Sequence, residues 1–143
     1  MDTVEVTGSW RVLPQMHARM GEAVRNLHPD AHFGAHWSHI YPEGACQYMT
    51  VRLPPMEHAD AMHLHREAWR RLESICLELG GSIAHHHGVG VFRNEWLREE
   101  LGSGLELLQI LKDGIDPRTL LNPGKVGLRA SPGALTIPPG NAR

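Results

Sequence analysis

Apolar and polar residues follow regular spacings along the first half of the chain, and these spacings predict its first elements. Residues 3–7, Thr-Val-Glu-Val-Thr, alternate in polarity and are mostly β-branched, which predicts a short strand. Apolar residues then recur at helical spacing from Trp10 to Leu27. This stripe predicts a helix that begins close to Pro14, because proline fits a first turn, and ends before Pro29.

Two further strands are predicted as a hairpin, over residues 32–41 and 45–53, joined by the turn Pro-Glu-Gly at 42–44. One face of the pair collects the apolar residues Phe33, Ala35, Trp37, Met49, Val51 and Leu53. The other face collects the polar residues His32, His36, Ser38, Tyr48, Thr50 and Arg52. This division is typical of a sheet that is covered on one side only.

A long helix is predicted over residues 57–79, and Gly80-Gly81 ends it. Residues 82–84 then begin a short last strand, which completes the order β-α-β-β-α-β. That order is the ferredoxin-like motif, so the sequence predicts an α+β fold in which both helices cover one face of an antiparallel sheet. The bare polar face predicts a partner, a second domain or a ligand on that side.

Shorter helices are predicted after this core, near residues 94–101 and 103–115, and Asp116-Pro117 can cap one more turn. The last residues are rich in proline and glycine and show no periodicity. We therefore expect one folded region over residues 1–128 and a flexible tail over residues 129–143.

Composition narrows the class of protein. The length of 143 residues suits one domain, and 41% apolar residues can form a core. A net charge of −2 without a stripe of basic residues argues against nucleic acid as a partner. No apolar run reaches the ~18 residues of a membrane span, and the first residues do not resemble a signal peptide. Cys46 and Cys76 match no metal-ligand spacing and are typical of buried thiols in a reducing compartment. This predicts a cytoplasmic location and leaves peripheral contact with a membrane open.

Three consecutive histidines, His85 to His87, stand between glycine pairs. If this segment is extended, its side chains alternate, so we expect His85 and His87 to point one way and His86 the other. One strand cannot then aim all three at an ion, and no cysteine or HExxH pattern supplies a further ligand, so we expect no metal site. Two interpretations stay open: a polar turn with exposed imidazoles, or titratable groups held against a bound molecule, which flexible glycines can approach closely.

Tyr41 ends the predicted strand just before Pro42. From the residues alone it is either a tyrosine packed in an interface or a phenol that gives or takes a proton in a closed site.

Three stretches together resemble a known family: HIYPEGACQYMTVRL at 39–53, GGSIAHHHGVGVFRNEWLREELG at 80–102 and DPRTLLNPGKV at 116–126. They are similar to the C-terminal part of FAD-linked oxidases of the vanillyl-alcohol oxidase superfamily. The HHHGVG run and the Y-x-x-G-A-C turn indicate the branch of alkyldihydroxyacetonephosphate synthase and its bacterial relatives. The similarity covers about residues 1 to 128.

The resemblance implies a cofactor and partners. Members of the family hold most of their FAD in a separate N-terminal domain, while a C-terminal domain with a ferredoxin-like sheet closes over the flavin and forms the substrate pocket. We therefore expect this chain to be the later part of the second domain. Its partners would be an FAD-binding domain that the chain lacks and a small-molecule or lipid-like substrate. An alternative of another class is a standalone ferredoxin-like binding module that forms a homodimer through its open sheet.

The resemblance also assigns roles to residues. Tyr41 matches the family's catalytic tyrosine, which handles a proton near the flavin. His85, His86 and His87 match a catalytic histidine run beside flavin and substrate phosphate, and His85 and His87 are also expected to contact the cofactor. Asn122, in the LNPGK turn, matches a cofactor-binding position of D-lactate and glycolate dehydrogenases.

Two reactions remain open. The histidine run is the synthase feature, and the synthase exchanges an acyl group on dihydroxyacetone phosphate for a fatty alcohol, a step in ether-lipid synthesis. The LNPGK turn is instead shared with FAD-linked 2-hydroxyacid dehydrogenases and oxidases, which pass a hydride to FAD.

Overall fold

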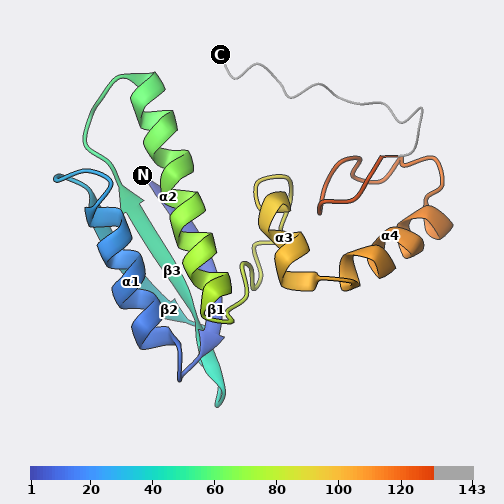
Figure 1. Ribbon diagram of the computed structural model, residues 1–143, viewed down its shortest axis with the longest axis horizontal. Coiled ribbons are helices and arrows are strands. Elements are labelled where there is room, and N and C mark those ends of the chain that lie inside the picture. Colours follow the sequence, from blue (N-terminus) through green and yellow to red (C-terminus); the bar gives the residue numbers. More distant parts are fainter. Residues whose placement is uncertain (131–143) are drawn as a thin grey trace. The chain divides into compact units, whose positions relative to one another are not determined.

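Three antiparallel strands form an open sheet in the first part of the chain, in the order β1-β3-β2 (Figure 1). The strands are β1 (Asp2–Ser9), β2 (His32–Ser38) and β3 (Gly44–Arg52). The computed structural model describes residues 1–130 and divides the chain after Gly88 into two compact units, which we describe separately.

The register of the strands sorts their side chains onto two faces. Glu5 on β1 lies opposite Tyr48 on β3, which lies opposite His36 on β2. One residue earlier on β1, Val4 is opposite Met49. Because alternate residues of a strand point to opposite faces, the first set forms a polar face and the second belongs to the apolar face, as the sequence predicted.

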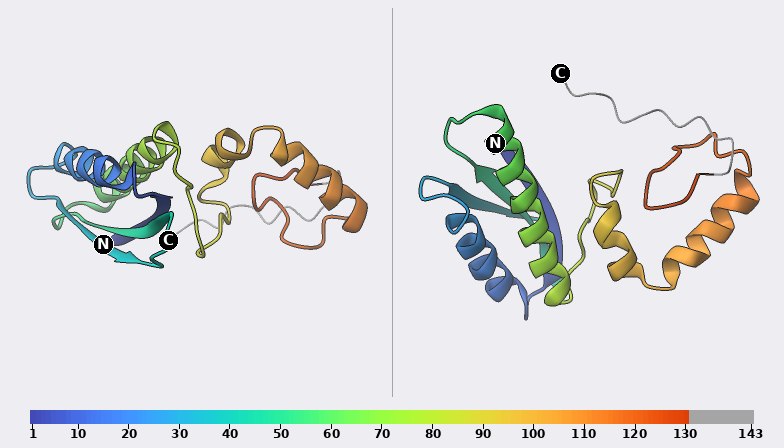
Figure 2. Two further views of the ribbon diagram at one scale, coloured as in Figure 1. Left: turned by 90° about the horizontal axis from the view of Figure 1, so that it is seen from below. Right: turned by 45° about the horizontal axis from the view of Figure 1, so that its top comes forward.

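Two helices cover the apolar face and leave the polar face open: α1 (Leu13–Arg25) and α2 (His58–Glu78). Both lie on the same side of the sheet (Figure 2). Pro14 is in the first turn of α1, as expected, whereas Trp10 precedes the helix and stacks on Trp37 with ring centroids 6.2 Å apart. The core between helices and sheet contains the fully buried Val4, Val6, Leu13, Met16, Met20, Val24, Met49 and Leu72. The predicted α+β fold, with an antiparallel sheet covered on one face, is confirmed.

The expected fourth strand forms only one bridge. Ser82 pairs antiparallel with Thr7 at the free edge of β1, with N–H···O distances of 2.9 and 2.8 Å. Gly81 permits this close approach, because a Cβ there would lie 2.7 Å from the Cys76 Sγ and 2.8 Å from the Thr7 carbonyl oxygen. Beyond the bridge the chain leaves the sheet edge, and residues 85–87 form a bend instead of a strand.

The second unit contains α3 (Asn94–Leu101) and α4 (Gly104–Ile115), close to their predicted bounds. The extra helical turn expected after Asp116 does not form. Instead the Asp116 carboxylate accepts the N–H groups of Leu120 and Leu121, both at 2.9 Å, and the ammonium of Lys112 at 2.5 Å. The hydrogen bond from Lys112 lowers the pKa of Asp116 to about 2. These bonds satisfy the backbone groups that another helical turn would have used.

The domain boundary expected at residue 128 stays a prediction, and most of the tail expected over residues 129–143 lies outside the described residues. Within residues 1–130, no helix is both long enough and apolar enough to cross a membrane.

Candidate active site

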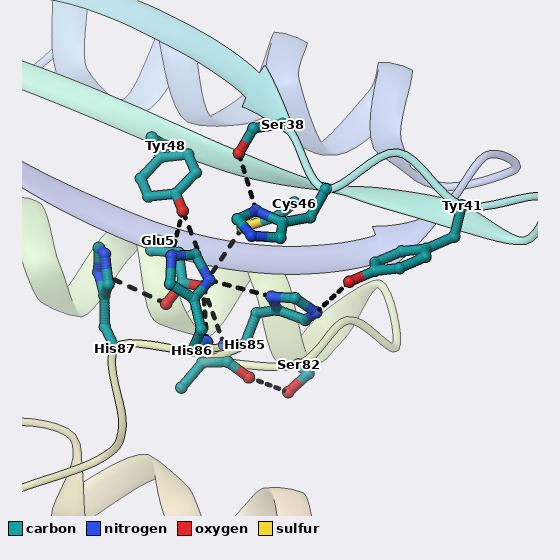
Figure 3. Close-up of polar contacts among 11 residues, drawn as sticks. Glu5, Ser38, Tyr41, Cys46, Tyr48, Ser82, His85, His86 and His87 are labelled. Atoms are coloured by element: carbon teal, nitrogen blue, oxygen red, sulfur yellow. Dashed lines mark hydrogen bonds and ion pairs between the residues drawn. The ribbon is translucent and has the colours of Figure 1, made fainter.

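A buried carboxylate, Glu5, lies at the centre of a polar cluster on the open face of the sheet (Figure 3). Its side chain is 0% exposed. Its Oε1 accepts the backbone N–H groups of His85 and His86, both at 3.1 Å, and the thiol of Cys46 at 3.3 Å. Burial alone would raise the pKa of Glu5, but these donors outweigh burial and hold the pKa below its ordinary value. Glu5 is therefore ionised at neutral pH and anchors the histidine segment to β1.

The three histidines gather around this carboxylate. The Nδ1 atoms of His86 and His87 lie 3.0 and 3.6 Å from the two oxygens of Glu5. The Nδ1 of His85 lies 3.0 Å from that of His86. The prediction that His86 points away from its two neighbours is wrong, because residues 85–87 bend around Glu5 and strand alternation does not apply to a bend.

The chain's two tyrosines contact the outer nitrogens of the cluster. The Tyr41 hydroxyl is 3.2 Å from the Nε2 of His85, and the Tyr48 hydroxyl is hydrogen-bonded to the Nε2 of His86. Tyr41 and the histidine run, which the sequence assigned to one site, are therefore in direct contact although they are 44 positions apart. Their chemical roles stay predictions.

Local structure around the β2–β3 hairpin places Tyr41. The strand β2 ends at Ser38, and His39 turns the chain with a φ of 49°. The backbone N–H of Tyr41 donates to the Gly44 carbonyl at 2.8 Å, and the indole N–H of Trp10 donates to the Tyr41 carbonyl at 2.9 Å. These bonds fix the backbone of Tyr41, while its side chain stays 43% exposed.

Tyr41 also lines a surface hollow of about 370 Å³ at the end of the sheet. The other lining residues are Thr7, Gly8, Ser9, Glu43, Gly44, Gly80, Gly81 and Ser82. Because several of these residues are glycines, which have no side chain, backbone atoms form much of the wall of the hollow. Tyr41 thus borders both the hollow and the histidine cluster.

Sequence reasoning missed three members of the cluster: Glu5, Cys46 and His39. The ring of His39 lies 4.4 Å from that of His86, measured between centroids, and its Nδ1 is 3.0 Å from the Ser38 hydroxyl. A signal existed for Glu5, because it is the one carboxylate within the β-branched stretch Thr3–Thr7 and falls on the polar face. Nothing local in the sequence links Cys46 to the histidines.

Burial and the neighbouring charges set the protonation of the cluster. Burial lowers the pKa of His86, Glu5 opposes this, and the nearby His39, His87 and His85 lower it further, so the net shift is downward. Burial and Glu5 raise the pKa of the Cys46 thiol to about 12. At pH 7 the thiol is thus protonated and His86 is mostly neutral.

Four of these residues could also bind a metal ion: Glu5, Cys46, His85 and His86 each offer a ligand atom, and the four atoms lie within 4.8 Å of one another. The structure therefore supplies the further ligands that the sequence argument did not find. However, these atoms already bond to each other, and an ion would have to displace the proton of a thiol with a pKa of about 12. The expectation of no metal stays a prediction.

Asn122, the remaining candidate, belongs to the second unit. It is exposed, with a φ of 47°, and its carbonyl accepts the Lys125 N–H at 3.2 Å, which closes the expected turn at 122–125. Its expected contact with a cofactor stays a prediction.

Comparison with known proteins agrees with this architecture. The model of the family described as FAD linked oxidases, C-terminal domain, matches residues 1–126. A solved structure of an alkyldihydroxyacetonephosphate synthase superposes on 85% of this chain and 20% of its own, with a TM-score of 0.55. Because the two are 24% identical in sequence, this match supports the fold alone.

Curated relatives fall into more than one activity. The uncharacterized FAD-linked oxidoreductase YgcU of Escherichia coli strain K12 is 33% identical over 136 residues, which cover 87% of this chain and 27% of that protein. Alkyldihydroxyacetonephosphate synthase of Dictyostelium discoideum is 36% identical over 93 residues, 64% of this chain and 15% of that protein. The glycolate oxidase subunit GlcD of Bacillus subtilis strain 168 is 37% identical over 68 residues, 47% of this chain and 14% of that protein. The chain thus spans about a quarter or less of the length of these relatives.

Proposed function

The chain belongs to the family of FAD linked oxidases, C-terminal domain, and on that premise we propose that it forms the substrate side of an FAD-dependent enzyme resembling alkyldihydroxyacetonephosphate synthase. The observation that carries this proposal is the contact between Tyr41 and His85 at 3.2 Å, beside a hollow large enough for part of a small molecule. A phenol and imidazoles that share hydrogen bonds at a surface hollow can move a proton to or from a bound substrate.

The open polar face fits a planar cofactor. No helix covers it within residues 1–88, and it presents imidazole and phenol groups that can donate or accept hydrogen bonds. Bound FAD would supply the redox chemistry and would be held mainly by an FAD-binding domain outside this chain. The residues of the chain itself would orient the substrate, exclude water and handle the proton at the Tyr41 oxygen.

The second unit offers a surface for that other domain. Helix α4 exposes the aliphatic side chains Leu107, Leu108, Ile110, Leu111 and Ile115. A patch of this kind on a soluble protein usually marks a contact surface. It supports the proposal that the chain works packed against a further domain.

A second candidate reaction is the oxidation of a 2-hydroxy acid with hydride transfer to FAD. The similarity to the glycolate oxidase subunit GlcD and the Asn122-Pro-Gly-Lys turn favour it. The two reactions are separable by their substrates. The enzyme for these assays would combine this chain with an FAD-binding domain, by putting this chain in place of the matching segment of the Dictyostelium synthase. It would be assayed for fatty-alcohol exchange and, with an artificial electron acceptor, for oxidation of D-lactate and glycolate.

The substitution Tyr41→Phe in that assembled enzyme tests the role of the phenol. We expect normal FAD content and a turnover lowered by about 10² to 10⁴, the usual effect of removing a general acid or base. Tyr48→Phe is the matched comparison, because it removes the chain's other phenol from the same cluster but not from the hollow, and we expect a loss below about tenfold. Turnover of Tyr41→Phe within a factor of three of the unchanged enzyme would contradict the proposal.

A further inference from the structure

Hydrogen bonding in the cluster constrains where its protons lie. We propose that Glu5 is a positioning residue that fixes the tautomers of His86 and His85, and that it thereby leaves the hydroxyl proton of Tyr41 available to a substrate. The inference rests on the proposed function in one respect, namely that Tyr41 meets the substrate. The contacts of Glu5 and the two histidines carry the rest.

Contact with Glu5 determines which ring nitrogen of His86 carries the proton. Its Nδ1 lies 3.0 Å from the Oε1 of Glu5. An ionised carboxylate has only acceptor sites, so a bare nitrogen lone pair at that distance would be repelled. The Nδ1 of His86 must therefore carry a proton. In neutral His86 the Nε2 is then an acceptor, which agrees with its hydrogen bond to the Tyr48 hydroxyl, an O–H group that can donate.

The proton on His86 in turn determines the tautomer of His85. The two Nδ1 atoms are 3.0 Å apart, and a hydrogen bond between them needs one donor and one acceptor. The Nδ1 of His86 carries one proton, which faces two acceptors at 3.0 Å, the Oε1 of Glu5 and the Nδ1 of His85. The two share this proton in a three-centre bond, so the Nδ1 of His85 is an acceptor. Neutral His85 then carries its proton on Nε2, as happens whenever one ring nitrogen of a histidine is held as an acceptor.

The tautomer of His85 determines the direction of its hydrogen bond with Tyr41. The Nε2–H of His85 donates to the Tyr41 oxygen at 3.2 Å, so this oxygen is the acceptor in their bond. The hydroxyl proton of Tyr41 is then not used within the bond and can point elsewhere. Since Tyr41 lines the hollow, the phenol can donate a hydrogen bond or a proton to a molecule bound there. With the opposite tautomers, the Tyr41 hydroxyl would instead donate its hydrogen bond to the Nε2 of His85 and would have no proton left for the substrate.

The remaining groups around His86 are compatible with this arrangement. They are Cys46 and Tyr48 on β3, His39 after β2, and His85 and His87 beside it in the chain. Cys46 donates its thiol proton to Glu5 and remains protonated at neutral pH. Glu5 is the one ionised carboxylate among these groups, which is why it sets the direction of the bonds.

The test is nitrogen-15 NMR of the histidine rings in the 143-residue chain, at about pH 8, where ordinary imidazoles are neutral. The two ring nitrogens of each histidine report directly which one carries the proton. We expect His86 to be protonated on Nδ1 and His85 on Nε2. A proton on Nε2 of His86, or on Nδ1 of His85, overturns the proposal.

Glu5→Gln then tests whether the charge of Glu5 sets this pattern, because glutamine keeps the size and an acceptor oxygen. In the folded variant we expect the pKa of His86 to fall by about one unit, the effect of losing an opposite charge at this distance, and the preference of His85 for Nε2 to weaken. Glu22→Gln removes the same charge from an exposed site on α1 and should change neither property. A His86 titration in Glu5→Gln equal to that of the unchanged chain overturns the proposal.

If Glu5→Gln does not fold, the unchanged chain with carbon-13-labelled glutamate carboxyls gives the answer. The Glu5 signal should shift in the pH range in which His86 titrates, and no such shift overturns the proposal. None of these measurements needs FAD or substrate. Failure here would leave the proposed function standing, whereas an active Tyr41→Phe enzyme would remove the proposed function and leave the tautomers standing.

Discussion

The sharpest stability prediction concerns Gly44, the first residue of β3 and part of the turn that holds Tyr41. A Cβ at this position would lie 2.0 Å from the Gly8 carbonyl oxygen and 2.9 Å from the Ser9 Cα. Carbon and oxygen atoms in ordinary close contact are about 3.3 Å apart. Gly44→Ala must therefore separate β1 and β3 by roughly 1 Å at this point. The atoms in the way are backbone, which cannot rotate aside as a flexible side chain can.

The magnitude follows from what this separation disturbs. Forcing one extra carbon into packed structure costs about 1–3 kcal/mol. Two backbone hydrogen bonds depend on the same contact, from Trp10 to the Glu43 carbonyl at 3.0 Å and from Tyr41 to the Gly44 carbonyl at 2.8 Å, and each contributes about 1 kcal/mol. If both bonds are lost, we expect the free energy of unfolding to fall by about 3–5 kcal/mol, a large part of the 5–15 kcal/mol typical of a domain.

Urea unfolding, followed by tryptophan fluorescence and circular dichroism, measures this loss. Gly34→Ala is the matched control, because it makes the same change in β2, where no atom lies within 4 Å of the new Cβ. A strand glycine is less favourable than alanine by roughly 0.5–1 kcal/mol, so this control should be unchanged or slightly more stable. Gly44→Ala within about 0.5 kcal/mol of the unchanged chain, or an equal loss in both variants, would refute the reasoning.

Three further predictions concern pH, metal and association. Burial would raise the pKa of Asp2, but hydrogen bonds from Trp69 at 2.6 Å and His65 at 2.5 Å hold it below its ordinary value of 3.8. The contribution of Asp2 to stability is therefore complete above pH 4 and is lost as the pH falls through its pKa in the folded chain. Asp2→Asn should lower the free energy of unfolding, measured in urea, by about 1 kcal/mol at pH 7 and should weaken its decrease at acid pH. Elemental analysis of the purified chain should find no stoichiometric zinc, and chelator should leave the assembled enzyme active; activity lost with chelator and restored by zinc would instead show that the cluster of Glu5, Cys46, His85 and His86 binds metal. The isolated chain should self-associate through its uncovered polar face, and His36→Glu should weaken this in sedimentation velocity; a monomer at all concentrations would count against it.

Local patterns were sufficient to predict most of the fold. Alternation in β1, β2 and β3 and the helical stripes of α1 and α2 are properties of neighbouring residues, and the glycine and proline positions marked where these elements stop. Prediction failed where a distant group competes with local preference. Residues 82–84 were predicted as a strand, but after Ser82 the carboxylate of Glu5 draws the N–H groups of His85 and His86 away from the edge of β1. The predicted helical turn after Asp116 does not form for the same reason, because the Asp116 side chain accepts the N–H groups of Leu120 and Leu121.

The sequence by itself determined the α+β class, the apolar face that the helices cover and the segments that carry reactive side chains. These depend on residue type and spacing, which a linear pattern records. Only the tertiary structure decided which reactive groups meet. Tyr41 reaches His85 because the β2–β3 hairpin and the segment after Ser82 converge at one end of the sheet. The histidine segment turns toward Glu5 because a buried carboxylate must be surrounded by donors. The backbone N–H groups of His85 and His86 and the rings of His86 and His87 meet it from 80 or more residues away along the chain.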